Sequence, residues 1–218
     1  MSRTYQLLIF DWDGTLMDSA GRIISAMQTA ARLTGQPEPT ARSILDVMGL
    51  SMDLVYALLF PGMVGTARDR YEEVYRHQYI VADPTPSPLF LGAEPVLAEL
   101  RQAGYTLAIA TGKARRGLVR ALDETGVGHY FVASRCADEA ASKPDPAMIH
   151  GLLAETGVAP EAALMIGDSV HDMAMARNAG VHGLAATYGA QVQERLAEHL
   201  PIDFLHDIRH LPDWLAQA

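Results

Sequence analysis

The sequence predicts an α/β protein with a doubly wound parallel sheet into which an all-helical segment is inserted. Short apolar runs alternate with helical patterns over residues 1–17 and 86–218, as in proteins whose parallel sheet lies between two layers of helices. Residues 18–85 show helical periodicity and no convincing strand. We therefore expect an α/β core made of residues 1–17 and 86–218, and a helical cap made of residues 18–85.

The core elements follow from short apolar runs and the breaks between them. The first strand ends in the run Leu7 to Phe10, which is typical of a strand buried on both faces. In chain order, the expected strands are residues 6–10, 106–110, 130–132, 162–166, a short one near 184, and 202–205. The expected helices are residues 93–102, one around 118–122, one over 143–156 with Pro144 at its first turn, and one around 173–176.

Four helices are expected in the cap. The first begins at Asp18 or Ser19 and ends at Gly35, and the second is capped by Thr40 and stopped by Gly49. The third covers residues 51–59 and the fourth about 64–80, before a connector with alternating prolines over residues 83–88. Because this insertion follows the first strand directly, the cap should lie over the carboxyl end of that strand and act as a lid.

Composition restricts the class of protein. A chain of 218 residues with 49% apolar and 20% charged residues is typical of a globular protein with a packed core. The net charge is −9 and the basic residues are scattered, which argues against nucleic acid or an anionic membrane as the main partner. There is no apolar run of about 18 residues for a membrane span, the amino-terminal run is too short for a signal peptide, and Cys136 is the single cysteine. We expect a cytoplasmic protein.

Two carboxylates follow the first strand. Asp11 comes directly after it and Asp13 two residues later, ahead of Gly14 and Thr15. A carboxylate beside a buried strand needs a partner, and ligands of open α/β sheets bind at the carboxyl ends of the strands. Two carboxylates this close repel each other, which fits a shared cation or a proton on one of them. The alternative is a polar strand-to-helix turn, where Asp and Gly occur for conformational reasons.

Two later strands also end in polar residues. Thr111 and Gly112 follow the strand at 106–110, where a hydroxyl and a closely approaching backbone can hold phosphate oxygens, although a helix cap would look the same. Asp168 follows the strand at 162–166, and Asp172 lies four residues later on the same helix face. Carboxylate oxygens are the ligands that Mg²⁺ prefers. The alternative is that Asp168 caps the helix and Asp172 is favourably placed near its start.

Lysine is rare in this chain. Lys113 and Lys143 are the only two, beside fifteen arginines. The compact ammonium of Lys143 can neutralise a carboxylate and a phosphoryl group together. The alternative is a solvated lysine at the start of a helix, where its charge is mildly unfavourable to the helix dipole. That penalty favours a functional role.

Four segments together resemble, in order, the four motifs of the haloacid dehalogenase-like hydrolase superfamily, in its branch with a helical cap. The segments are Asp11-Trp12-Asp13-Gly14-Thr15-Leu16, Thr111-Gly112-Lys113, Lys143-Pro144 and Gly167-Asp168-Ser169-Val170-His171-Asp172. Over nearly the whole chain, the nearest resemblance is to phosphoglycolate phosphatase-like members, including relatives that act on pyrophosphate or nucleotide monophosphates. The resemblance implies a Rossmann-like core.

The resemblance also implies a phosphatase that acts on a small phosphorylated metabolite. Asp11 would be the nucleophile that accepts the phosphoryl group, and Asp13 would be the general acid and base. Thr111, Gly112 and Lys143 would bind the phosphoryl oxygens, and Lys143 would also offset charge during the transfer. The protein would work as a monomer or a homodimer.

Magnesium is the cofactor that the resemblance implies. Mg²⁺ would be held by the side chain of Asp11, the backbone carbonyl of Asp13 and the side chain of Asp168. Asp172 would bind it either directly or through another group.

Some other activities of this superfamily are disfavoured by the sequence, and others stay open. Asp13 argues against a dehalogenase, whose halide leaving group needs no proton, and the absence of lysine from residues 18–85 argues against a phosphonate hydrolase that uses a cap lysine. Sugar phosphomutases share the four motifs and stay open, as do pyrophosphatases and nucleotide phosphatases. A catalytically silent member that binds a phosphorylated ligand or a protein through its cap also stays open.

Substrate-selecting side chains are expected where the cap faces the metal. The candidates are Arg22, Arg42, Gly49, Leu50 and Met52. Other residues are expected to be structural: His171 on a helix surface, Arg115, Arg116 and Arg120 on a solvated helix face, and Met27, Met48 and Met52 as core filler.

Overall fold

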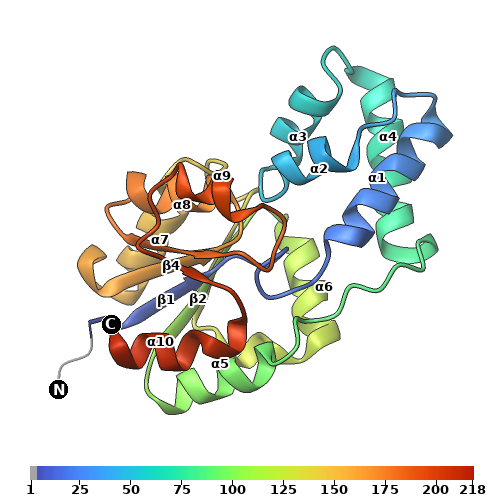
Figure 1. The fold of residues 1–218 in the computed structure, drawn as a ribbon. Helices are drawn as coiled ribbons and strands as arrows, with labels where there is room; N and C mark the ends of the chain where they lie inside the picture. The colour runs from blue at the N-terminus through green and yellow to red at the C-terminus, as the bar shows by residue number, and fades with distance from the viewer. Residues whose placement is uncertain (1–3) are drawn as a thin grey trace.

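Six parallel strands form one sheet in the computed structural model, which describes residues 4–218 (Figure 1). The first three residues of the predicted core segment 1–17 lie outside the described residues. The strands are β1 (Leu7–Phe10), β2 (Thr106–Thr111), β3 (Ala133–Cys136), β4 (Ala163–Gly167), β5 (His182–Ala186) and β6 (Asp203–Leu205). Their order across the sheet is β3-β2-β1-β4-β5-β6, which confirms the doubly wound fold.

Strand β1 lies at the centre of the sheet. Leu8 pairs with Leu107 of β2 on one side and with Leu164 of β4 on the other. All four residues of β1 are buried, because helices cover both faces of the sheet. The chain builds outward from β1 to β3 and then returns to β4, so the strand order reverses beside β1. Crevices at this point of an open α/β sheet are where ligands bind.

Two layers of helices cover the sheet. Helices α5 (Ala93–Gln102), α6 (Arg115–Thr125) and α10 (Leu211–Gln217) pack on the face that carries Leu8 and Phe10. Helices α7 (Ala147–Thr156) and α8 (Val170–Asn178) pack on the face that carries Leu7 and Ile9, and the short α9 (Gln193–Ala197) packs beside β5. Figure 1 shows α5 and α10 along one side of the sheet and α7 and α8 along the other.

The cap segment contains only helices among its described elements. They are α1 (Ala20–Thr34), α2 (Ala41–Val47), α3 (Met52–Leu59), α4 (Gly65–His77) and a π-helical turn, η1 (Gln78–Ala82), which continues α4. They pack around two apolar clusters, one centred on Ile44 and one on Tyr71. Figure 1 shows these helices to one side of the sheet. The division of the chain after residues 17 and 85 stays a prediction.

Two predicted core elements are wrong in position. Residues 127–130 form a 3₁₀ turn, η2 (Val127–Tyr130), and the strand follows at β3 instead of 130–132. The cause is that β3 is an edge strand with polar Ser134 and Arg135, whereas the apolar Val127 is buried in the preceding turn. Helix α7 begins at Ala147 rather than at 143, because the Asp145 side chain accepts a hydrogen bond from the Ala147 N–H (2.9 Å) and starts the helix there.

Two further predictions concern the whole chain. No helix within residues 4–218 has the length and apolar character needed to cross a membrane. Cys136 is a free, buried cysteine at the end of β3.

Candidate active site

Three neighbouring strands deliver polar residues to one edge of the sheet. Asp11 follows β1, Thr111 ends β2 and Asp168 follows β4. Because β1 lies between β2 and β4 and all three strands are parallel, their carboxyl ends lie side by side. The strand ends that the sequence predicts to carry polar residues are therefore neighbours in the sheet. Each of the three side chains is buried.

Lys143 lies at the centre of this edge and is fully buried. Its Nζ lies 2.9 Å from Asp11 Oδ1 and 2.6 Å from Asp172 Oδ1. Burial by itself lowers the pKa of Lys143, but the Asp11 and Asp172 carboxylates raise it above its ordinary value. Lys143 is therefore a charged ammonium held between two carboxylates, the arrangement that a buried charge requires.

Asp11 has one satisfied and one unsatisfied oxygen. Oδ1 accepts hydrogen bonds from the Trp12 N–H (2.7 Å) and is paired with Lys143, whereas Oδ2 is buried without a hydrogen-bond partner. Burial raises the pKa of Asp11 well above its ordinary value, and Lys143 opposes that rise. A buried carboxylate oxygen without a donor is costly. Asp11 Oδ2 is thus the atom at this edge that is free to react or to bind a cation.

Three carboxylates form a cluster that fits a divalent cation. Ligand oxygens of Asp11, Asp168 and Asp172 all lie within 4.8 Å of one another, and all three residues are buried. Asp168 is oriented by hydrogen bonds from Thr15 Oγ1 (2.9 Å) and the Ala190 N–H (2.7 Å). Burial, and then the charge of Asp172, raises the pKa of Asp168 to about 7. Hard oxygen donors that repel one another are the donor set that Mg²⁺ suits.

Asp172 differs from Asp168 in its partners: both carboxylates have both oxygens in use, but Asp172 is the one that is paired with Lys143. Oδ1 is paired with Lys143, and Oδ2 accepts hydrogen bonds from the Ser169 N–H (3.1 Å) and from Ser169 Oγ (2.6 Å). Ser169 and Asp172 form a capping box at the start of α8. Asp172 thus fixes both the helix start and the position of Lys143.

The side chain of Asp13 is not one of the three clustered carboxylates. Its Oδ1 accepts a hydrogen bond from Ser19 Oγ (2.6 Å), and its Oδ2 lies 2.9 Å from Lys113 Nζ. Lys113 also donates to the Tyr79 hydroxyl of the cap (3.2 Å). Burial alone lowers the pKa of Lys113, but Asp13 and Tyr79 raise it above its ordinary value. Lys113 was not among the residues predicted to have a role, although its rarity as one of two lysines was a usable signal.

Thr111 and Gly112 lie where β2 meets the cap. Thr111 Oγ1 accepts a hydrogen bond from the Lys113 N–H (3.2 Å). A Cβ atom on Gly112 would lie 2.3 Å from the carbonyl oxygen of Gly49, so the cap loop is packed directly on this glycine. Gly49 has a φ of 89°, and a Cβ there would lie 3.6 Å from Asp11 Oδ2. The loop at Gly49 therefore covers Asp11.

Further polar contacts hold the cap against the core. His171 Nε2 donates to the Asp46 carbonyl (3.0 Å), and Arg195 pairs with the Asp46 carboxylate. The Ser51 N–H donates to Ser142 Oγ (2.9 Å). His171, which was expected on a helix surface, lies on α8 and is half-buried where the cap contacts it. The structure is that of a closed cap.

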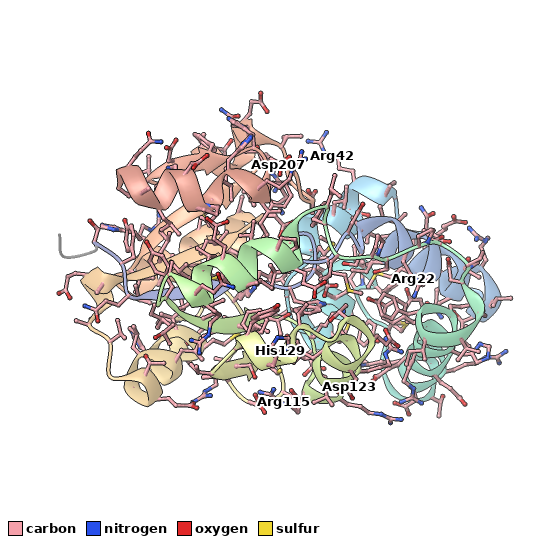
Figure 2. All side chains as sticks on the ribbon, turned by 90° about the horizontal axis from the view of Figure 1, so that it is seen from below. Arg22, Arg42, Arg115, Asp123, His129 and Asp207 are labelled. Atoms are coloured by element: carbon pink, nitrogen blue, oxygen red, sulfur yellow. The ribbon has the colours of Figure 1, made fainter. Side chains whose placement is uncertain are left out.

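A cavity of about 630 Å³ lies between the cap and the core. Of the candidate substrate-selecting residues, Gly49, Leu50 and Met52 line it. Arg22 and Arg42 are not among its lining residues: Arg22 Nε donates to the Thr85 carbonyl in the connector (2.6 Å), and Arg42 is exposed on the cap (Figure 2).

Two groups of residues expected to be structural also line the cavity. Met27 and Met48 are buried in the cap core, as expected, and with Met52 they form part of the cavity wall. Arg116 is exposed, as expected, and lines the cavity with Arg120, whereas Arg115 is half-buried and donates to Glu139 (2.6 Å) and Ser134 Oγ (2.7 Å). The helix face of α6 is thus shared between the cavity and the core.

Comparison with known proteins places these features in context. Residues 8–186 match the family model described as haloacid dehalogenase-like hydrolase. The chain is 31% identical to a phosphoglycolate phosphatase of Vibrio cholerae, over 94% of each chain. It is 36% identical to a probable phosphatase IndB of Dickeya dadantii, over 87% of this chain and 84% of that one. A solved predicted phosphoglycolate phosphatase from Haemophilus somnus has the same fold (TM-score 0.89, 22% identity), with 98% and 99% of the chains covered.

Proposed function

We propose that this chain, which belongs to the haloacid dehalogenase-like hydrolase family and is a phosphatase, hydrolyses a small phosphomonoester. In the proposed reaction Asp11 carries the phosphoryl group as a covalent intermediate. The observation that carries the proposal is the Asp11 carboxylate, whose Oδ1 is held by Lys143 at 2.9 Å while Oδ2 is buried without a partner. A nucleophile needs one oriented atom with a free lone pair, and Oδ2 meets that need.

In the first step, Asp11 Oδ2 forms a bond to phosphorus and the bond to the leaving oxygen breaks. The Lys143 ammonium offsets the charge that the attacking carboxylate and the phosphoryl oxygens share. Thr111 and Gly112, at the end of β2, would bind phosphoryl oxygens. Asp13 gives its proton to the leaving alkoxide, which departs as the alcohol.

In the second step, Asp13 takes a proton from a water molecule, which attacks the aspartyl-phosphate. Phosphate leaves, and Asp11 is restored as a carboxylate. Ser19 and Lys113 hold the two oxygens of Asp13, at 2.6 and 2.9 Å, in one orientation for both steps. The closed cap excludes bulk water from the first step and must open for exchange of product.

Mg²⁺ is the cation we propose for the carboxylate cluster. Asp11, Asp168 and the backbone carbonyl of Asp13 would hold it, with Asp172 acting mainly through Lys143. When bound, it would supply positive charge next to the phosphoryl oxygens. We also propose that the reaction takes place in the cytoplasm, which is supported by the free, buried Cys136.

The proposal is tested with p-nitrophenyl phosphate and Mg²⁺, with and without a chelator. Asp11→Asn should lose at least about a thousandfold in kcat, as expected when a nucleophile is removed. Asp18→Asn is the matched control, because Asp18 is an exposed carboxylate on the same segment between β1 and α1. Mass spectrometry of acid-quenched enzyme should find phosphate on Asp11. Equal rates for wild type and Asp11→Asn would contradict the proposal.

A further inference from the structure

The cavity between cap and core is far more apolar than a small acidic substrate requires. Its inner wall comes from buried apolar side chains of the cap: Ile23, Met27, Ile44, Val47, Met48 and Val55. Its volume of about 630 Å³ is within the roughly 300–1,000 Å³ of pockets that enclose drug-sized ligands. A two-carbon acid bound in this cavity would leave most of its apolar wall uncovered.

The position of the cavity assigns it to the leaving group. Asp13, Gly112 and Lys113 line it, whereas Asp11 and Lys143 do not. In the proposed mechanism Asp13 protonates the leaving oxygen. The part of the substrate attached to that oxygen therefore extends past Asp13 into the cavity, while the phosphoryl group faces Asp11 beneath the loop at Gly49.

The charges on the cavity wall do not match a carboxylate ligand. Lys113 is already paired with Asp13 at 2.9 Å, and the arginines Arg76 and Arg116 are exposed. Arg120 Nε lies 3.5 Å from Glu124 and is buried without a hydrogen-bond partner. Lys113 is partly buried, and the acidic Glu72 and Asp123 also line the cavity. Each lining cation is thus either exposed or beside a carboxylate, so a second negative group on the substrate would compete with water or with that carboxylate.

Aromatic rings at the cavity favour a planar or chain-like apolar group. Tyr75 and Tyr79 line the cavity with ring centroids 6.0 Å apart, and the Lys113 ammonium lies 5.0 Å from the Tyr79 ring centroid. Methionine and tyrosine side chains adapt to flat and flexible apolar ligands.

We propose that the substrate is the phosphate monoester of an alcohol with an apolar body at least the size of a six-carbon chain or a phenyl ring, and that phosphoglycolate is a poor substrate. This inference rests on the proposed function, because it takes Asp13 as the group that protonates the leaving oxygen. The apolar body is buried against the cap, and its transfer from water selects the substrate.

A series of primary alkyl phosphates tests the inference without changing leaving-group chemistry. Ethyl, butyl, hexyl and 2-phenylethyl phosphate are compared with phosphoglycolate, with Mg²⁺ present. We expect kcat/KM to rise about fourfold per methylene, and so by about 250-fold over the four methylenes from ethyl to hexyl phosphate. Hexyl and 2-phenylethyl phosphate should both exceed phosphoglycolate. Equal values along the series, or the highest value for phosphoglycolate, would overturn the inference and leave the proposed function standing.

A charge placed in the cavity should reverse the preference. Met52→Lys puts an ammonium among the lining residues, so kcat/KM for hexyl phosphate should fall at least tenfold and that for phosphoglycolate should rise. Leu54→Lys is the matched control, because Leu54 lies on the same helix, is 40% exposed and does not line the cavity. In the control, kcat/KM for hexyl phosphate and kcat/KM for phosphoglycolate should both stay at their wild-type values. An unchanged preference in folded Met52→Lys would count against the inference.

Binding separates failure of this inference from failure of the proposed function. Hexylphosphonate and ethylphosphonate, which cannot be hydrolysed, are titrated calorimetrically into the wild-type protein with Mg²⁺. Tighter binding of hexylphosphonate, by about 250-fold, supports the inference even if no phosphate ester is turned over. Absence of turnover for every ester contradicts the proposed function alone. Equal affinities of the two phosphonates overturn the substrate class.

Discussion

Lys113 Nζ lies 2.9 Å from Asp13 Oδ2, so the proposed general acid of the core is paired with a lysine that also donates to the cap. The second partner of Lys113 is the Tyr79 hydroxyl, at 3.2 Å, on the turn η1. One ammonium therefore contacts both parts of the molecule. Lys113 holds one oxygen of Asp13 while Ser19 holds the other, and Tyr79 contributes to the placement of Lys113.

Lys113→Met should lower kcat by about ten- to a hundredfold, because a hydrogen bond to a charged group contributes about 1.5–3 kcal/mol. Tyr79→Phe keeps the Lys113–Asp13 pair and loses only a neutral hydroxyl, so its kcat should fall by about two- to tenfold. Steady-state kinetics with ethyl phosphate, which is too short to fill the cavity, measures both. A larger effect for Tyr79→Phe than for Lys113→Met would contradict this assignment.

Lys143→Met should destabilise the protein by about 3–5 kcal/mol, because it leaves two buried carboxylates without their cation. Mg²⁺ should raise the melting temperature of the variant by more than that of wild type, since the ion restores positive charge among Asp11, Asp168 and Asp172. Thermal unfolding with and without Mg²⁺ measures this.

Arg32→Met is the control for loss of a single cation. Arg32 pairs with Glu38 at 2.5 Å, but the two side chains are 54% and 41% exposed, so the loss of stability should be under about 1 kcal/mol.

The same Mg²⁺-induced shift in melting temperature in wild type and Lys143→Met would show that the cluster does not hold the ion.

Gly112→Ala should hinder closure of the cap. The added methyl group would lie 2.3 Å from the Gly49 carbonyl oxygen, which belongs to the backbone and cannot rotate away. Overpacking of this kind costs about 1–3 kcal/mol, so we expect kcat/KM to fall roughly tenfold and amide hydrogen exchange around Gly49 to rise.

Gly117→Ala serves as the comparison, because its new methyl group would have Lys113 Cβ as nearest neighbour at 4.0 Å, an ordinary contact. That variant should keep wild-type exchange around Gly49. A Gly112→Ala protein with unaltered exchange and kinetics would refute the close packing of cap on core.

Cys136 should be inert in the native protein and should make stability fall at alkaline pH. Burial raises the pKa of the Cys136 thiol to about 12, whereas an unfolded thiol has a pKa of about 8.5. Between these values the unfolded chain loses a proton that the native chain keeps, so the free energy of unfolding falls as pH rises, by up to about 1.4 kcal/mol per unit.

Urea unfolding between pH 8.5 and 10 measures that slope, with Cys136→Ala as the variant in which it should become shallower. Native protein should react with a thiol reagent only after unfolding, because the side chain has no exposed surface. Rapid labelling of native protein at pH 8 would rule out the buried thiol.

Local pattern was sufficient for the central strands and most helices. The apolar run ahead of Asp11 predicts a strand covered on both faces, and β1 is that strand. The cap helices begin and end close to the predicted residues, at Gly35 for α1 for example, because capping and glycine termination act within one turn. Local pattern failed at β3, where position at the edge of the sheet, and not hydrophobicity, decides which residues pair.

The site was less predictable than the fold. Spacing along the chain was enough to place Asp11, Thr111 and Asp168 at strand ends. It could not indicate that Asp13 faces Lys113, or that both oxygens of Asp172 are already used. Side-chain direction at a strand end depends on neighbours from other parts of the chain, such as Tyr79 on the cap turn, which lies 34 residues before Lys113.

The sequence by itself determined a phosphatase of known family with a parallel sheet, a helical insertion and the residues able to react. Strand burial, helix caps and motif spacing are short-range properties, so they can be read along the chain. Only the tertiary structure decided that the cap places buried methionine, valine and isoleucine side chains beside Asp13, and leaves Arg22 and Arg42 outside the cavity. The face that a helix presents to a second domain depends on how the two domains dock, and that docking is set by contacts distributed over the whole interface.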